Sequence, residues 1–328
     1  MGFIADIPFP YRGGKPVIHA EGARRTSYWK GFTKRVRRDR YLLLMLVFPM
    51  VFYALFRYGP MYGLSMAFVN FKAKTGIWGS PFVGLQYFEK FMKDPMFWGA
   101  LRNTVVLNLC ILAFCFPAPI ILALMLNEVR SRRWKRFAQS VSYMPFFIST
   151  VVVCSIVISF CANQGVINGL LTSLGAKRVD FMRELGWFRP IYVISELWQI
   201  TGWNSIIYLA ALSGSDMEVY EAAYIDGASR MQRLRYITLP YLTPTICIML
   251  ILAVGGIMDV SLEKVFLLQQ PSTYGVSEVI ATLVYRVGIK NTNFSYASAI
   301  GMFQSLVSMI FIITANYVIG KMSDISLF

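Results

Sequence analysis

The feature that most limits the fold is a series of apolar blocks, each long enough to cross a lipid bilayer. About 20 apolar residues in a helix span the ~30 Å of hydrocarbon. Blocks of this length and freedom from charge occur six times, at residues 41–58, 103–126, 138–161, 190–213, 241–259 and 297–320. The chain is 56% apolar and only 15% charged, more apolar than an ordinary soluble domain. The sequence therefore predicts an all-α, polytopic membrane protein with about six transmembrane helices.

The distribution of basic residues predicts how these helices are oriented. Lys and Arg concentrate in the cytoplasmic segments of membrane proteins. Residues 1–40 carry ten basic residues against three acidic ones, and the short loop 127–137 carries five basic residues. We therefore expect a basic cytoplasmic tail at 1–40, a permease domain at 41–321 and a short cytoplasmic tail at 322–328. This topology explains the net charge of +15 without a nucleic-acid partner.

Several kinds of chemistry find no support in the sequence. His19 is the only histidine, which argues against histidine catalysis and multi-histidine metal sites. The five cysteines lie in or beside apolar blocks, without metal-site spacing. A G-x-x-x-x-G-K-[ST] phosphate loop is absent from the sequence, because the run RGGK at 12–15 lacks both its first glycine and its final hydroxyl residue. We expect no enzymatic activity, metal or cofactor on this chain.

The most informative segment is 215–240, between the fourth and fifth spans. A capping-box pattern at Ser215 and Glu218 predicts a short helix that begins near Asp216. Gly227 ends this helix, and Ser229 can cap a second one. The segment therefore reads as two short helices bent about a glycine, on the cytoplasmic side.

This segment resembles the EAA loop of bacterial ABC importer permeases. The positions that match in identity and spacing are Glu221, Ala222, Ala223, Asp226, Gly227, Ala228, Ile237, Leu239 and Pro240. Leu234 departs from the pattern, because many members have phenylalanine there, but it keeps an apolar side chain. The resemblance implies the type I ABC importer permease fold and a coupling helix that docks on a separate ATPase subunit.

Other segments narrow the resemblance to permeases that import oligosaccharides and polysaccharide fragments. They include YGPMYGLSMAF (58–68), WGSPFVGLQYFEKF (78–91), SYMPFFIS (142–149) and WNSIIYLAAL (203–212). The chain is most similar to the alginate-importing members. The resemblance implies a second, related permease subunit and two ATPase subunits that bind ATP and Mg. It also implies an extracytoplasmic solute-binding protein and a multi-pass location in the bacterial inner membrane, with cargo moved by alternating access.

Polar side chains inside the spans are candidates for the cargo path, because they are costly in a membrane. The candidates are Glu196, Trp198, Gln199, Trp203, Asn204 and Asp259. Tryptophan rings and amides suit the apolar faces and hydroxyl rims of sugars, but the same residues can serve helix packing. Asp259, Glu263 and Lys264 can equally cap and solvate the outer end of the fifth span.

Two other functional classes are weighed against the ABC permease. A self-sufficient secondary transporter or channel usually carries ionisable relays along several spans, and the EAA-like loop has no role in it. A membrane-embedded enzyme needs a carboxylate cluster, metal ligands or an activated nucleophile, whereas acidic residues are sparse here. Uptake or turnover by the purified chain alone would favour one of these classes.

Overall fold

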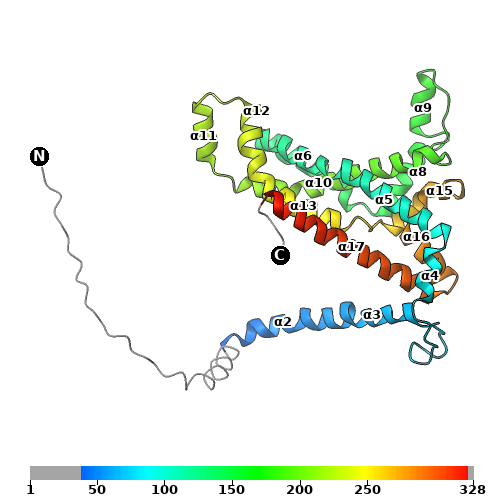
Figure 1. The fold of residues 1–328 in the computed structure, drawn as a ribbon. Coiled ribbons are helices and arrows are strands. Elements are labelled where there is room, and N and C mark those ends of the chain that lie inside the picture. The colour runs from blue at the N-terminus through cyan, green and yellow to red at the C-terminus, as the bar shows by residue number, and fades with distance from the viewer. Residues whose placement is uncertain (1–37, 324–328) are drawn as a thin grey trace, which may run out of the picture. The chain divides into compact units, whose positions relative to one another are not determined.

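The computed structural model describes residues 38–323, with only the backbone described for 322 and 323. Regular structure in this range is helical, apart from isolated β-bridges that pair Val69 with Phe82 and Lys72 with Gly76 (Figure 1). Most of the expected tails, 1–40 and 322–328, lie outside the described residues. The chain divides into two compact units, residues 1–62 and 63–328, which are described separately below.

The first unit contains one continuous apolar helix. It consists of α2 (Arg40–Tyr53), a π-helical turn η1 (Ala54–Tyr58) and α3 (Gly59–Met61). None of its residues is buried, and large apolar side chains project on all sides. A helix that is apolar all round and not buried in protein is suited to a hydrocarbon environment. It corresponds to the first predicted span.

The second unit is a bundle of long helices with shorter elements at its two ends. The long elements are α5 (Pro95–Cys115), α6 (Pro117–Glu128), α7 (Arg132–Tyr143), α8 (Thr150–Cys161), α10 (Phe188–Ser213), α13 (Leu239–Gly255) and α17 (Phe294–Ser323). Helix α10 is central, because it packs against α5, α6, α7, α8 and α13.

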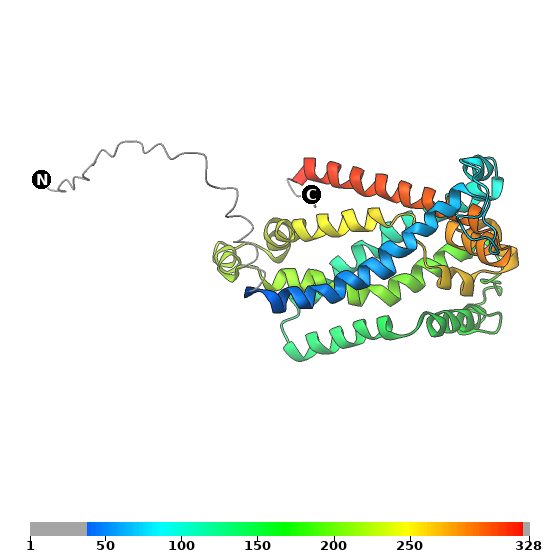
Figure 2. The ribbon, with the colours of Figure 1, turned by 90° about the horizontal axis from the view of Figure 1, so that it is seen from below.

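The shorter elements gather at opposite ends of this bundle (Figures 1 and 2). One end, which we call the α11 end, carries α11 (Met217–Ile225), α12 (Arg230–Arg233) and the π-helical η5 (Leu234–Thr238). The other, the α15 end, carries α4 (Gln86–Met92), α9 (Val166–Ser173), α14 (Leu262–Leu268), α15 (Tyr274–Ser277), α16 (Ile280–Tyr285) and η7 (Arg286–Lys290). The short 3-10 turns are η2 (Tyr62–Phe68), which begins at the last residue of the first unit, and η3 (Met144–Phe147), η4 (Leu185–Trp187) and η6 (Pro271–Thr273) in the second.

The prediction of about six transmembrane helices is confirmed. Five helices in the described range are long and apolar enough to span a membrane, judged by length and composition alone. Helix α10, which corresponds to the fourth predicted span, is not among these five; its 26 residues measure about 39 Å, enough to cross the hydrocarbon. It is less apolar than these five because it carries polar side chains such as Glu196 and Gln199.

The third predicted span differs from a single helix over 138–161. It is broken into α7, the 3-10 turn η3 and α8, and α7 begins six residues before the predicted start. Pro145, within η3, lacks a backbone N–H and cannot continue an α-helix. The sequence did not predict this earlier start, because the basic residues before position 138 interrupt the apolar pattern by which the span was recognised.

Candidate functional site

The first part of the EAA-like segment is helix α11, capped by Asp216. The Asp216 carboxylate accepts a hydrogen bond from the Glu218 amide at 2.9 Å. The expectation that Ser215 caps this helix is wrong, because the Ser215 hydroxyl instead donates to the Leu212 carbonyl at the end of α10, at 2.8 Å. The helix nevertheless starts where the sequence predicted.

Gly227 ends α11 as predicted, in a left-handed conformation with φ of 78°. The Ala228 amide donates to the Ala223 carbonyl at 2.9 Å, and the Gly227 amide donates to the Tyr224 carbonyl at 3.1 Å. This pair of bonds is the Schellman motif, which requires positive φ at the glycine position. The bend between the two short helices is therefore fixed by the backbone.

The second short helix follows directly and leads into the fifth span. Ser229 and Gln232 form a reciprocal capping box at the start of α12, which confirms the predicted cap. The chain continues through η5 into α13, with Pro240 in the first turn of α13. The Tyr220 hydroxyl donates to Thr238 Oγ1 at 3.0 Å, so α11 is tied to the base of α13.

The EAA-like positions lie along α11, the bend and the chain that leads from it into α13, at the α11 end. The exposed ones are Glu221, Ala222, Asp226, Gly227 and Pro240, and the half-buried ones are Ala223, Ala228, Ile237 and Leu239. Leu234, which departs from the pattern, is also half-buried. A concavity of about 360 Å³ lies between the two arms of the bend, lined in part by Ala223, Gly227 and Ile237. Ile225, at the tip, exposes 83% of its surface. The surface offers an apolar knob and small residues to a partner.

A second cluster forms around a buried ion pair between α10 and α14. The Lys264 ammonium lies 2.6 Å from Glu196 Oε2 and 3.3 Å from Gln199 Oε1. Lys264 is only 1% exposed, and its Nζ lies 5.4 Å from the centre of the Tyr192 ring. The expectation that Lys264 helps to solvate the end of the fifth span is therefore wrong.

This cluster lines a cavity of about 400 Å³ with mixed polar and aromatic walls. Its lining residues are Phe146, Phe147, Ile148, Ser149, Thr150, Glu196, Gln199, Ile200, Ser261 and Lys264. The rings of Phe146 and Trp203 stack beside it, with centroids 4.5 Å apart and planes within 2° of parallel. Of the predicted cargo residues, Glu196, Gln199 and Trp203 are thus brought together, as their helical spacing requires.

The other predicted cargo residues lie on different faces. Trp198 lines an apolar cavity of about 680 Å³ between α8, α9 and α10. Asn204 lines a third cavity, of about 280 Å³, bounded by α5, α6, α10 and α13. Asp259 is exposed beyond the end of α13. A single cargo path therefore does not unite all six candidates in this conformation.

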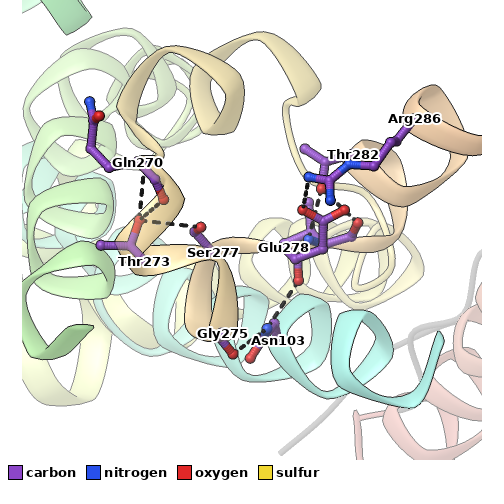
Figure 3. A network of polar contacts seen from close by, with 9 residues as sticks. Asn103, Gln270, Thr273, Gly275, Ser277, Glu278, Thr282 and Arg286 are labelled. Carbon is purple, nitrogen blue, oxygen red and sulfur yellow. Dashed lines mark hydrogen bonds and ion pairs between the residues drawn. The ribbon is translucent and has the colours of Figure 1, made fainter. Parts of the chain in front are cut away.

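Sequence reasoning did not identify a polar network at the α15 end (Figure 3). Asn103 in α5 donates its amide hydrogens to the carbonyls of Gly275 and Glu278, at 3.1 and 3.0 Å, and Arg189 donates to Asn103 Oδ1 at 3.0 Å. Arg286 donates to Glu278 Oε2 at 2.7 Å. Burial raises the pKa of the Glu278 carboxyl, and the Arg286 charge opposes this shift in pKa. The signal in the sequence was Asn103 itself, an amide at the start of an apolar block.

Comparison with known proteins agrees with this architecture. A family described as "Binding-protein-dependent transport system inner membrane component" matches residues 116–324. Protein LplB of Bacillus subtilis (strain 168) is 41% identical over 294 residues, covering 89% of this chain and 92% of that protein. The polygalacturonan/rhamnogalacturonan transport system permease protein YteP, from the same organism, is 38% identical over 288 residues, covering 88% and 90%.

A solved structure is similar over most of the chain. It is the crystal structure of a bacterial ABC transporter involved in the import of the acidic polysaccharide alginate, with a TM-score of 0.82 and 38% identity over 89% of this chain and 99% of that one. The predicted resemblance, the all-α permease fold and the function of a permease subunit for sugar or polysaccharide import are confirmed. The chain belongs to the family of binding-protein-dependent transport system inner membrane components.

Proposed function

We propose that this chain forms half of the membrane pathway of a bacterial inner-membrane importer of acidic oligosaccharides or polysaccharide fragments, with both of its termini in the cytoplasm. A second, related permease subunit supplies the other half. Two separate ATPase subunits bind ATP and Mg, and an extracytoplasmic binding protein delivers the cargo. The observation that carries this proposal is the projecting bend of α11 and α12, with matched EAA positions along its surface.

The bend suits a coupling element because it is locally rigid and exposes groups that a partner can grip. The Schellman motif at Gly227 and the capping box at Ser229 fix both arms without help from the rest of the bundle. Ala222 and Ala228 permit close approach of a partner surface, and Glu221 and Asp226 can pair with its basic groups. An ATPase subunit docks on the bend through these small and acidic residues.

Movement of the bend reaches the membrane through α13. The Tyr220–Thr238 hydrogen bond ties α11 to η5, which continues without interruption into α13. Closure of the ATPase pair on ATP binding displaces the bend and reorients the spans. The cavity lined by Glu196, Gln199 and Lys264, which we call the cargo cavity, then opens to the outside. Hydrolysis then resets the cycle.

Acidic cargo is supported by two observations. The similar alginate transporter imports an acidic polysaccharide, and the similar permease YteP is named for polygalacturonan and rhamnogalacturonan transport. In addition, the segments on the side of the membrane opposite the basic tail and the loop 127–137 in the predicted topology, 57–102, 162–189 and 259–296, hold 13 basic residues against 7 acidic ones. A net positive entrance attracts anionic cargo electrostatically. The cavity at Glu196, Gln199 and Lys264 offers hydrogen-bonding groups next to aromatic rings, as sugar recognition requires.

Uptake by the reconstituted transporter tests this proposal. Proteoliposomes that contain this chain, its partner permease, the ATPase subunits and the binding protein should accumulate labelled oligouronate only when ATP is supplied. Glu221→Lys should reduce uptake to background, because it places a cation where the partner needs an anion, whereas Glu184→Lys, the same charge change at the α15 end, should retain most of it. Uptake by this chain without the ATPase subunits would favour a secondary transporter instead.

A further inference from the structure

Helix α7 turns its small and polar residues toward the protein and its large apolar residues away from it. Ala138, Gln139 and Ser142 are half-buried. The opposite face exposes an apolar stripe that continues into Met144, the first residue of η3; Trp134, Phe137, Val141 and Met144 are 68%, 61%, 49% and 61% exposed. The spacing of 3, 4 and 3 residues places these four side chains on one face of a helix. This pattern is the reverse of that in a water-soluble protein.

The protein-facing side of α7 is firmly seated on α10. A Cβ atom added to Gly202 would collide with the carbonyl oxygen of Ser142, so the two backbones are in direct contact. The exposed stripe therefore cannot be turned inward without separating the helices. Since α7 forms the first half of the third predicted span, the stripe lies at the depth of the bilayer.

A dense group of cations marks the end of the stripe at which α7 begins. Within seven residues the sequence places Arg130, Arg132, Arg133, Lys135 and Arg136. None of them takes part in an ion pair within the part of the chain that the structure describes. Helix α6 ends at Glu128 near α11 and α12, so these cations lie at the α11 end of the bundle, where the span leaves the membrane (Figure 1).

We propose that the start of α7 is a binding site for anionic phospholipids. Acyl chains cover the stripe of Trp134, Phe137, Val141 and Met144, and phosphate headgroups neutralise the cations of residues 130–136. Trp134 lies between the two zones, in the interfacial position that tryptophan prefers in membranes. The lipid occupies a place on this chain separate from both the cargo cavity and the coupling bend.

Charge complementarity identifies the occupant as lipid rather than a protein subunit. Five neighbouring cations repel one another unless anions approach, and an anionic leaflet supplies mobile anions at the depth where an apolar stripe meets the membrane surface. Each cation near such a surface contributes about 1 kcal/mol, or roughly a fivefold preference for anionic over neutral lipid. Removal of several cations should therefore abolish most of the preference.

Quenching by brominated lipids tests the proposal on the full-length chain, together with any subunits that copurify with it, in lipid nanodiscs. Intrinsic tryptophan fluorescence is compared in discs containing equal mole fractions of brominated phosphatidylglycerol or brominated phosphatidylcholine. The difference between wild type and Trp134→Phe isolates the signal of Trp134. We expect that signal to be quenched several-fold more effectively by the anionic lipid, and the preference to shrink as salt is raised.

Two matched variants separate a local site from the general field of a basic protein. Replacing the exposed Arg130, Arg132, Arg133 and Arg136 by Gln should remove the preference. Replacing four exposed cations elsewhere, Lys72, Lys74, Lys93 and Lys177, by Gln should leave it intact. Three results would overturn the proposal. The first is equal quenching of Trp134 by the two lipids, and the second is an equal loss of the lipid preference in both variants. The third is a Trp134 that neither brominated lipid quenches because another subunit covers it.

Discussion

The buried ion pair between Glu196 and Lys264 makes an asymmetric prediction about stability. Glu196→Gln leaves the Lys264 ammonium in place, in a side chain that is only 2% exposed. Its remaining neighbours are the Gln199 amide oxygen at 3.3 Å and the Tyr192 ring at 5.4 Å. An uncompensated buried charge of this kind costs about 3–5 kcal/mol of the free energy of unfolding.

The reciprocal substitution should cost less. Lys264→Met leaves the Glu196 carboxylate, but that side chain is 23% exposed and water can reach it. The expected loss is about 1–3 kcal/mol. The double variant removes both charges and should lie within about 1 kcal/mol of wild type, because replacing a whole buried pair is often nearly neutral. The two substitutions should therefore be coupled by at least about 2 kcal/mol.

Equilibrium unfolding of the full-length chain by SDS in mixed micelles measures these free energies for the four proteins of the cycle. Two results would refute the reasoning. One is a Lys264→Met variant as unstable as Glu196→Gln or more so, which would mean that the carboxylate and not the ammonium is the desolvated partner. The other is additivity of the two single changes, which would mean that the charges do not interact.

Three further changes test other parts of the fold. Gly202→Ala should lower the free energy of unfolding by about 1–3 kcal/mol, because the new methyl group forces α7 away from α10 at Ser142. The control Gly301→Ala has open space at its Cβ and should be neutral or mildly stabilising in the same unfolding assay. Gly227→Ala forces a left-handed alanine and should lower ATP-driven uptake, with a structural cost of about 1–2 kcal/mol. Because the folded-state pKa of Glu278 is raised, its stabilising contribution should be greatest below the ordinary value of 4.5 and be lost as pH rises through the folded-state pKa. As pH rises from below 4.5 through the folded-state pKa, the thermal unfolding midpoint of wild type should fall more steeply than that of Glu278→Gln.

The features that the sequence predicted correctly are those fixed by local chemistry. The bend at Gly227 and the cap at Ser229 depend on residues within a few positions of each other, so their pattern is visible in one dimension. The spans depend on length and hydropathy, which are equally local. The predicted cap at Ser215 was wrong by only one residue, because the Asp216 side chain accepts a hydrogen bond from a backbone amide in the first turn of α11 instead.

The features that the sequence did not predict depend on tertiary contacts. Lys264 stands in a charged stretch that reads as solvated, and only its approach to Glu196, 68 residues away in sequence, makes it a buried partner. Trp198 and Asn204 lie near Gln199 in sequence but face other cavities, since each residue turns a helix by about 100°. The Asn103 network joins α5 to a segment 172 or more residues distant, which no local pattern reveals.

The most direct test of the central claim is a site-specific crosslink from the tip of the α11–α12 bend, which we propose docks on the ATPase. A photoreactive phenylalanine analogue at Ile225, the exposed tip of α11, should form an adduct with the ATPase subunit in the assembled transporter, and the yield should change when ATP is added. The same analogue at Leu174, exposed at the α15 end, should form no such adduct. Absence of an ATPase adduct from Ile225 in a complex that still imports its cargo would contradict the account.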